Sequence, residues 1–206
     1  MIERKVFFDE VRTTIFGGSL SQGQVASMDA TLDMWALYTL KQGAAGLLLD
    51  GLPDIRWLAY VFATQLGEVG KNMEPVRESF ARFDKDARAN LSATYADEDS
   101  ETGESYYGRG LTQITHRSNF QALSDVFGID LVAAPDIALG LHAAVLFQLY
   151  GMIRGTFTGQ ALVDHINEQK CDYYNARTII NGHDRASEIA GYAEKFEDAL
   201  HEASDT

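Results

Sequence analysis

The chain has 206 residues, 46% of them hydrophobic, with a formal net charge of -13 and a single cysteine, Cys171. This length and apolar content exclude a disordered chain and predict one folded domain over residues 1–206. The negative charge argues against a nucleic-acid partner, because phosphates attract lysine and arginine. It also disfavours electrostatic capture by anionic bacterial walls, whereas a neutral sugar polymer remains compatible.

The first ten residues have mixed charge and predict a helix rather than a secretion signal. The apolar run at residues 44–49 is far too short to span a bilayer. We therefore expect production in the cytoplasm without a classical export signal, and no stable membrane insertion.

Apolar residues spaced by three and four predict a helix over residues 3–15. Ser21 and Gln24 have the spacing of a capping box that opens a second helix, in which Trp35 is expected in the core. Asp54 is the expected N-cap of a third, buried helix that ends at Glu68. A carboxylate at a helix C-terminus in apolar surroundings should have a raised pKa, which favours an acid.

Pro75 suits the first turn of a fourth helix, with Phe80 and Phe83 on its inner face. Residues 84–105 are polar and strongly acidic, and we interpret them as a loop with a weak helix near 85–92. The spacing of the acidic residues fits no calcium loop, so a solvated loop is favoured over a metal site.

The second half of the chain again has helical signals. Ser118 and Gln121 predict a capping box, and Pro135 the start of a long core helix. A further helix is expected over residues 172–180, and the last helix should begin near Asp184.

Residues 104–116 combine tyrosines, hydroxyl groups and an amide with Arg109 between Gly108 and Gly110. The two glycines allow a tight turn or a close approach of a ligand to the backbone. The segment is predicted to be a short β-hairpin or loop that forms a sugar-binding wall. The alternative is a hairpin that only links helices.

Other common catalytic signals are missing from the sequence. The five histidines have no metal-ligand spacing, and there is no Gly-x-Ser-x-Gly motif, phosphate loop or dinucleotide fingerprint. We predict no metal site and no cofactor, which leaves carboxylates as the reactive groups.

Residues 106–120, YYGRGLTQITHRSNF, resemble the Tyr-x-Gly-Arg-Gly-x-x-Gln-Leu-Thr-x-x-x-Asn-Tyr signature of glycoside hydrolase family 19. That family comprises chitinases and related endolysins of bacteriophages. Residues 16–25, 58–68, 72–78, 155–159 and 176–185 also resemble phage-type members, in the same order. The resemblance implies a mostly α, lysozyme-like helical domain with a short β-hairpin or loop near residues 104–116.

The resemblance implies an inverting mechanism with Glu68 as general acid and Glu78 as general base. Such carboxyl groups stand roughly 6.5–9.5 Å apart, which leaves room for the attacking water. Helix-breaking residues separate the two positions, so we expect the chain to fold back and place them across a cleft. Glu74 and Glu104 are the rival candidates for the base.

The resemblance also implies a substrate site. Its predicted residues are Tyr107, Arg109, Gln113, Thr115, Asn119 and Asn181. We expect Gln113, Thr115 and Asn119 to bind sugar or position water, and Asn181 to line the opposite wall. Tyr107 and Arg109 are expected to support the first wall.

One departure from the family pattern lies beside the predicted acid. The family has His-Glu-Thr or His-Glu-Ser, whereas this chain has Gly67-Glu68-Val69. The lost imidazole and hydroxyl would be partners of the acid, so reduced or altered activity is one consequence.

The implied activity is cleavage of β-1,4 bonds in bacterial peptidoglycan by an endolysin-like monomer. It would be made in the host cytoplasm and would act in the periplasm or cell wall after holin-type or other export. A chitinase acting on chitin oligomers is the first alternative. A catalytically decayed wall-binding or phage-structural protein is the second, favoured by Gly67, Val69 and the acidic surface.

Overall fold

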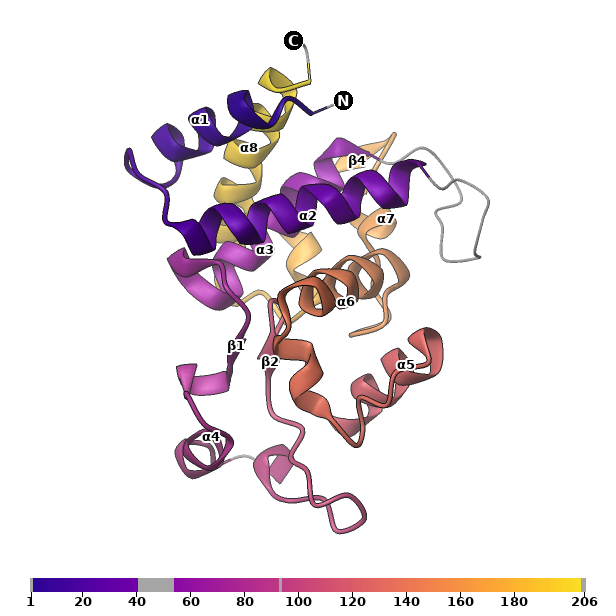
Figure 1. Cartoon of the computed structure of the whole chain (residues 1–206). Helices are drawn as coiled ribbons and strands as arrows, with labels where there is room; N and C mark the ends of the chain where they lie inside the picture. The colour runs from indigo at the N-terminus through magenta and orange to yellow at the C-terminus, as the bar shows by residue number, and fades with distance from the viewer. Residues whose placement is uncertain (1, 41–53, 93, 205–206) are drawn as a thin grey trace. The chain divides into compact units, whose positions relative to one another are not determined.

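The computed structural model describes residues 2–40, 54–92 and 94–204 and is mostly helical, as predicted (Figure 1). The α-helices are α1 Arg4–Thr14, α2 Gln22–Leu40, α3 Ile55–Val69, α4 Asp84–Asn90, α5 Arg117–Phe127, α6 Leu141–Arg154, α7 Leu162–His165 and α8 Ala186–Glu202. Short 3-10 helices are η1 Gly70–Asn72, η2 Glu78–Phe80, η3 Thr94–Ala96, η4 Pro135–Leu139 and η5 Asn175–Ile179. The strands are β1 Val76–Arg77, β2 Arg109–Gly110, β3 Ile166–Asn167 and β4 Lys170–Cys171.

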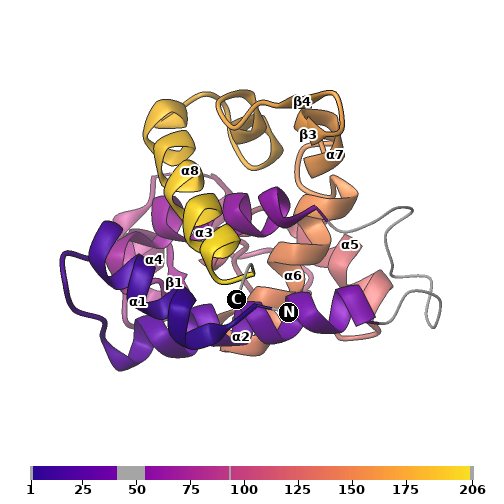
Figure 2. The same cartoon turned by 90° about the horizontal axis from the view of Figure 1, so that it is seen from above.

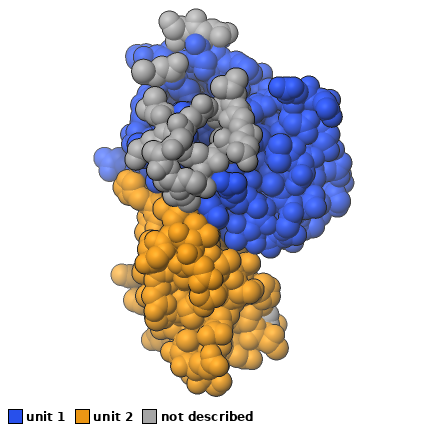
Figure 3. Space-filling view, turned by 90° about the vertical axis from the view of Figure 1, so that its right-hand side faces the viewer, with its two compact units in different colours: residues 1–73, 149–206 blue, residues 74–148 orange. Residues whose placement is uncertain are grey.

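The chain forms two compact units (Figure 3). The first unit contains residues 1–73 and 149–206, and the second contains residues 74–148. That the whole chain behaves as one domain stays a prediction.

Helix α3 is the core element of the first unit. It packs against α8, which also packs against α1 (Figure 2). The ring of Phe62 on α3 stacks with Phe7 of α1 at 5.3 Å and with Phe196 of α8 at 5.2 Å between ring centroids. All three side chains are fully buried. Burial of each ring contributes about 1.5–3 kcal/mol, so this aromatic stack holds α3 in place.

The predicted helix starts in the first unit are confirmed. The backbone N–H of Gln24 donates to Ser21 Oγ at 3.1 Å, and that of Ser21 donates to Gln24 Oε1 at 2.6 Å. Asp54 caps α3 by accepting from the N–H of Arg56 at 2.9 Å. Trp35 is buried, as expected. The apolar run at residues 44–49 lies outside the described residues.

Gly67 on α3 is a point of close approach between α3 and α8. A Cβ atom at this position would lie 2.8 Å from both Cδ1 and Cγ1 of Ile189. A histidine side chain would need the space that Ile189 occupies. The residue before Glu68 thus lies in the buried α3–α8 contact, and any side chain there would require Ile189 to move.

The end of the first unit differs in part from the prediction. The helix expected over residues 172–180 is only the 3-10 turn η5, and strands β3 and β4 form a hairpin that was not predicted. The last helix was correctly predicted, since α8 begins at Ala186, close to Asp184.

In the second unit, the helix predicted from Pro75 is wrong. Val76 and Arg77 instead form β1, which pairs antiparallel with β2. The pairing continues one residue further, because the N–H of Glu78 donates to the carbonyl of Gly108 at 2.7 Å. Phe80 and Phe83 are 69% and 52% exposed rather than in the core. Long-range strand pairing thus overrides the local helical pattern.

The predicted hairpin near residues 104–116 is confirmed. Arg109 and Ile114 exchange two backbone hydrogen bonds, of 3.2 and 2.9 Å, around a turn. Gly110 has φ +87°, and a Cβ there would lie 2.8 Å from the carbonyl oxygen of Ala138. Only glycine fits this position, where both the turn and the close approach of η4 must be accommodated.

Two predicted helices in the second unit form, but they differ in detail from the prediction. Helix α5 begins at Arg117 with His116 as its N-cap, so Ser118 lies inside the helix and cannot form the predicted capping box. The helix predicted from Pro135 is broken by extended backbone at Gly140 into η4 and α6.

The α3–α8 contact predicts opposite effects for two glycine substitutions. Gly67→Ala should lower the free energy of unfolding by about 1–3 kcal/mol, because the new methyl group overpacks Ile189. Gly191→Ala, in α8, should raise it by about 0.5–1 kcal/mol, because a Cβ added there would meet nothing within 4 Å. Urea unfolding followed by circular dichroism measures both. Equal stability of the two variants would contradict the packing argument.

Candidate active site

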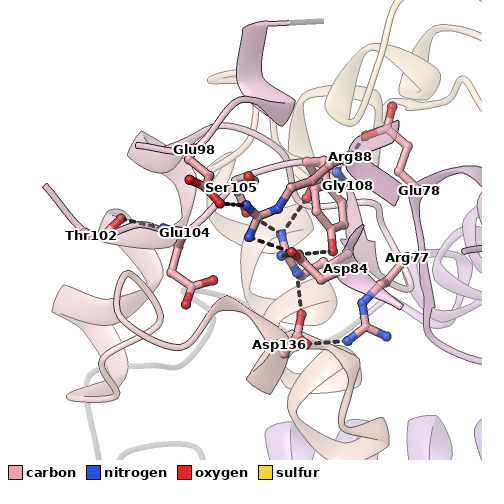
Figure 4. Close-up of polar contacts among 12 residues, drawn as sticks. Arg77, Glu78, Asp84, Arg88, Glu98, Thr102, Glu104, Ser105, Gly108 and Asp136 are labelled. Atoms are coloured by element: carbon pink, nitrogen blue, oxygen red, sulfur yellow. Dashed lines mark hydrogen bonds and ion pairs between the residues drawn. The ribbon is translucent and has the colours of Figure 1, made fainter. Parts of the chain in front are cut away.

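Glu78 in the second unit is held by two donors, Gly108 and Tyr95, and Figure 4 shows the first of these contacts. The backbone N–H of Gly108 donates to Oε2 at 2.7 Å, and the hydroxyl of Tyr95 donates to Oε1 at 2.7 Å. Burial of Tyr95 and its contact with the Glu78 carboxylate raise the pKa of Tyr95 to about 12. Tyr95 therefore keeps its proton at neutral pH, and the orientation of Glu78 is fixed from both oxygens.

Gly108 is the backbone position at which two predicted site residues meet. A Cβ there would lie 3.2 Å from Glu78 Oε2 and 2.8 Å from Gln113 Oε1. Gln113 has φ +53°, and its Nε2 donates to the carbonyls of Val76 and Gly110, at 3.0 Å each. Because Gly108 has no side chain, the Glu78 carboxylate and the Gln113 amide oxygen can both lie close to its backbone.

Gln113, Thr115 and Asn119 form one hydrogen-bonded series. Thr115 Oγ1 donates to the carbonyl of Gln113, and Asn119 Nδ2 donates to the carbonyl of Thr115, at 2.8 Å each. All three side chains are partly exposed. The structure therefore brings these three predicted residues together on one wall that also holds Glu78.

Arg109 and Tyr107 lie behind this wall and are fully buried. Arg109 Nε donates to Asp136 at 2.7 Å, and its Nη1 donates to the carbonyl of Ser105 at 2.7 Å. Its guanidinium carbon lies 3.8 Å from the centroid of the Tyr107 ring, and the Tyr107 hydroxyl donates to Asp84 at 2.6 Å. With no exposed surface, both residues can serve sugar binding only by holding the hairpin in place.

The Arg109 contacts belong to an ionic network of alternating charge (Figure 4). In order, its members are Arg77, Asp136, Arg109, Asp84, Arg88 and Glu98. Burial alone would raise the pKa of Asp136, but hydrogen bonds and ion pairs with Arg109 and Arg77 hold it below its usual value. The network ties β1 and β2 to η4 and α4.

The acidic side chains within residues 84–105 form contacts with other groups of the same unit. Glu98 pairs with Arg88, while Asp99 accepts from the backbone of Thr102 at 3.1 Å and faces Arg117 at 3.7 Å.

Over residues 2–40, 54–92 and 94–204, no group of three or more metal-ligating side chains is present. In the same ranges no helix is long and apolar enough to cross a membrane.

Glu68 lies in the last turn of α3 in the first unit, with its side chain 14% exposed. Its Oε1 forms an ion pair with the buried Arg177, whose Nε donates to the carbonyl of Asp184 at 2.9 Å. Arg185 donates to the carbonyl of Gly67 at 2.6 Å. The expectation of purely apolar surroundings for Glu68 is therefore wrong. Both arginines lie in the motif at residues 176–185, but no local spacing connects them with α3.

Asn181 lies in the first unit on the segment that follows η5, and it is exposed. Its backbone N–H donates to the carbonyl of Arg177 at 3.0 Å. One short segment thus carries both Asn181 and the partner of Glu68. Of the rivals for the base, Glu74 is exposed, and the two donors described above converge on Glu78.

The described part of the chain is thus a helical, lysozyme-like structure with a carboxylate fixed beside a Gly-Arg-Gly hairpin. Residues 76–151 match the model of glycoside hydrolase family 19, described as class I chitinase. The predicted resemblance to this chitinase-like family is confirmed, and it supports a glycoside hydrolase. The matched segment includes Glu78 and the whole hairpin.

Chitinases are also the proteins that the chain resembles by sequence and by fold. Over 32 residues it is 53% identical to Chitinase 11 of Oryza sativa subsp. japonica, a stretch that spans 16% of this chain and only 12% of that protein. Chitinase C from Streptomyces griseus HUT6037 has the same fold, with a TM-score of 0.53 at 16% identity over 97% of this chain and 76% of that chain. A bacterial family 19 chitinase matches with a TM-score of 0.50 at 16% identity, over 97% of this chain and 94% of that one.

The ionic network predicts that the second unit loses stability in acid. The folded-state pKa of Asp136 is below its unfolded value of about 3.9, so its stabilisation is present above that pH and is lost as the pH falls through the folded pKa. Asp136→Asn should lower the free energy of unfolding at pH 7 by about 1 kcal/mol, because the charge paired with Arg109 and Arg77 is lost and one of the two acceptor oxygens becomes a donor, while solvent partly screens this half-exposed carboxylate.

Urea unfolding between pH 3 and pH 7 measures this effect. The variant should also show a smaller acid dependence than the wild type. Asp198→Asn, at an exposed position of α8, is the matched control and should behave as the wild type. Identical acid dependence in all three proteins would contradict the role of Asp136.

Proposed function

We propose that this protein is an inverting glycoside hydrolase that cleaves β-1,4 bonds in a polysaccharide containing N-acetylglucosamine, with peptidoglycan as the favoured substrate. The observation that carries the proposal is the fixed Glu78 carboxylate beside Gly108 and Gln113. The confirmed family resemblance covers this group of residues.

Glu78 is proposed as the general base. Each of its oxygens accepts one hydrogen bond, from Gly108 or from Tyr95, and a carboxylate oxygen has a second lone pair for a water. A base must be oriented before it can take a proton from water. Gln113, whose amide nitrogen is held by two carbonyls, presents its oxygen on the same wall and would orient the water or the sugar.

Glu68 is proposed as the general acid that protonates the leaving oxygen. Its Oε1 accepts from Arg177 in an ion pair of the ionised carboxylate. The acid form therefore requires Glu68 to take up a proton, which we assign to Oε2, while Oε1 remains the acceptor of the Arg177 hydrogen bond. Arg177 takes over the positioning that histidine provides in the family triplet. We also propose that Asn181, on the same segment, contacts the sugar.

The choice between peptidoglycan and chitin rests on different observations. The motifs at residues 16–25, 72–78 and 176–185 resemble phage endolysins, which favours peptidoglycan. The similar proteins from Oryza sativa and Streptomyces griseus are chitinases, and the net charge of -13 suits a neutral polymer, which favours chitin as the second candidate. The decayed-protein alternative is weakened, because Gly67 has a packing explanation and the contacts of Glu78 are intact.

Substitution of each carboxylate tests the proposed roles. Glu68→Gln and Glu78→Gln should each lower the release of reducing ends by about 10²- to 10⁴-fold, since each removes a proton-transfer group. The assay compares purified peptidoglycan with colloidal chitin. Glu74→Gln, at an exposed position, is the control and should keep wild-type activity. Full activity in either site variant would refute the role assigned to that residue.

A separate experiment tests Tyr95, whose hydroxyl donates to the proposed base Glu78. Tyr95→Phe should lower kcat about tenfold with little change in KM, because Glu78 loses one of two orienting hydrogen bonds but keeps Gly108. Tyr106→Phe, which removes a hydroxyl bonded to the carbonyl of Val132 instead, is the matched control. Equal kcat values for the two variants would argue against a specific role for Tyr95.

A further inference from the structure

The backbone immediately after Glu78 breaks a local rule. Ser79 and Phe80 have φ values of +59° and +54°, and the N–H of Ala81 points back to the carbonyl of Glu78 at 3.5 Å. Two consecutive positive φ values are the pattern of a type I′ turn, which strongly favours Asn and Gly. A serine and a phenylalanine at these positions are strained.

This turn is fixed on both sides. The N–H of Glu78 donates to the carbonyl of Gly108 at 2.7 Å, and Arg77 Nη1 donates to the carbonyl of Arg82 at 3.1 Å. Arg77 is itself paired with Asp136 (Figure 4). Strained backbone persists only where its surroundings hold it, and it is concentrated at functional sites.

The strained turn presents an aromatic ring to solvent. Phe80 is 69% exposed, more than any other large apolar side chain among the described residues. Phe83 is also exposed, but the guanidinium carbon of Arg82 lies 5.2 Å from its ring centroid and covers one face. Phe83 also has ordinary extended backbone, with φ -122°. Phe80 is therefore the residue that combines a strained backbone with a solvent-exposed ring.

We infer that Phe80 is a stacking platform for one pyranose ring of the substrate, two residues from the base. The inference rests on the proposed function and adds a binding position to it. The C–H groups on one face of a pyranose ring are apolar and bind well to a flat aromatic face, while the hydroxyl groups stay hydrated. The rigid turn holds the ring in its binding position before the sugar arrives, which lowers the entropy lost on binding.

Phe80→Ala tests the platform directly. It should raise KM on the cleaved polymer about tenfold, as expected for loss of one aromatic contact area. The same fold-change should appear in the affinity for chitin tetrasaccharide or soluble peptidoglycan strands, measured by calorimetry in a Glu78→Gln background. Phe80→Trp should retain binding, and Phe83→Ala should match the wild type.

A second variant separates binding from folding. Phe80→Gly removes the ring and the backbone strain at this residue together, so its Tm should equal or exceed that of the wild type while its affinity falls as in Phe80→Ala. Wild-type KM and affinity in both variants, in an enzyme that still depends on Glu78, would overturn the platform alone. A wild-type protein that neither binds nor cleaves either polymer would overturn the proposed function and the platform with it.

Discussion

The buried guanidinium of Arg109 is the interaction on which the candidate base depends. A fully buried arginine is tolerated only when its donors are satisfied, and here Asp136, Asp84 and the backbone of the hairpin supply the acceptors. Those contacts fix β2, and β2 pairs with the strand that leads into Glu78. The position of the Glu78 carboxylate therefore depends on a charge network whose central residue, Arg109, is fully buried.

The candidate acid is positioned by a different kind of constraint, helix packing. The aromatic stack around Phe62 holds α3 against α8, and the glycine before Glu68 allows Ile189 to approach. A side chain at residue 67 would require Ile189 to move, since a Cβ there would lie 2.8 Å from the Ile189 side chain. A guanidinium from a later segment, Arg177, is the partner of the carboxylate.

Local sequence signals predicted helix starts and turns correctly wherever the contacts that form these elements are local. The Ser21 box, the Asp54 cap and the hairpin at residues 104–116 all depend on neighbours within a few residues, and all are confirmed. The helix from Pro75 was wrong because its hydrogen bonds go to residues more than thirty positions away. The Ser118 box failed because the helix begins one residue before Ser118, at Arg117, with His116 as the N-cap.

The sequence by itself determined the family resemblance, the mostly helical fold and the identity of the two candidate carboxylates, because motifs and helix periodicity are properties of consecutive residues. Only the tertiary structure decided the surroundings of those carboxylates. Gly108 and Tyr95 reach Glu78 through strand pairing and a loop, and Arg177 reaches Glu68 from more than a hundred residues away. Such contacts arise from packing between distant segments, for which one sequence has no local signal.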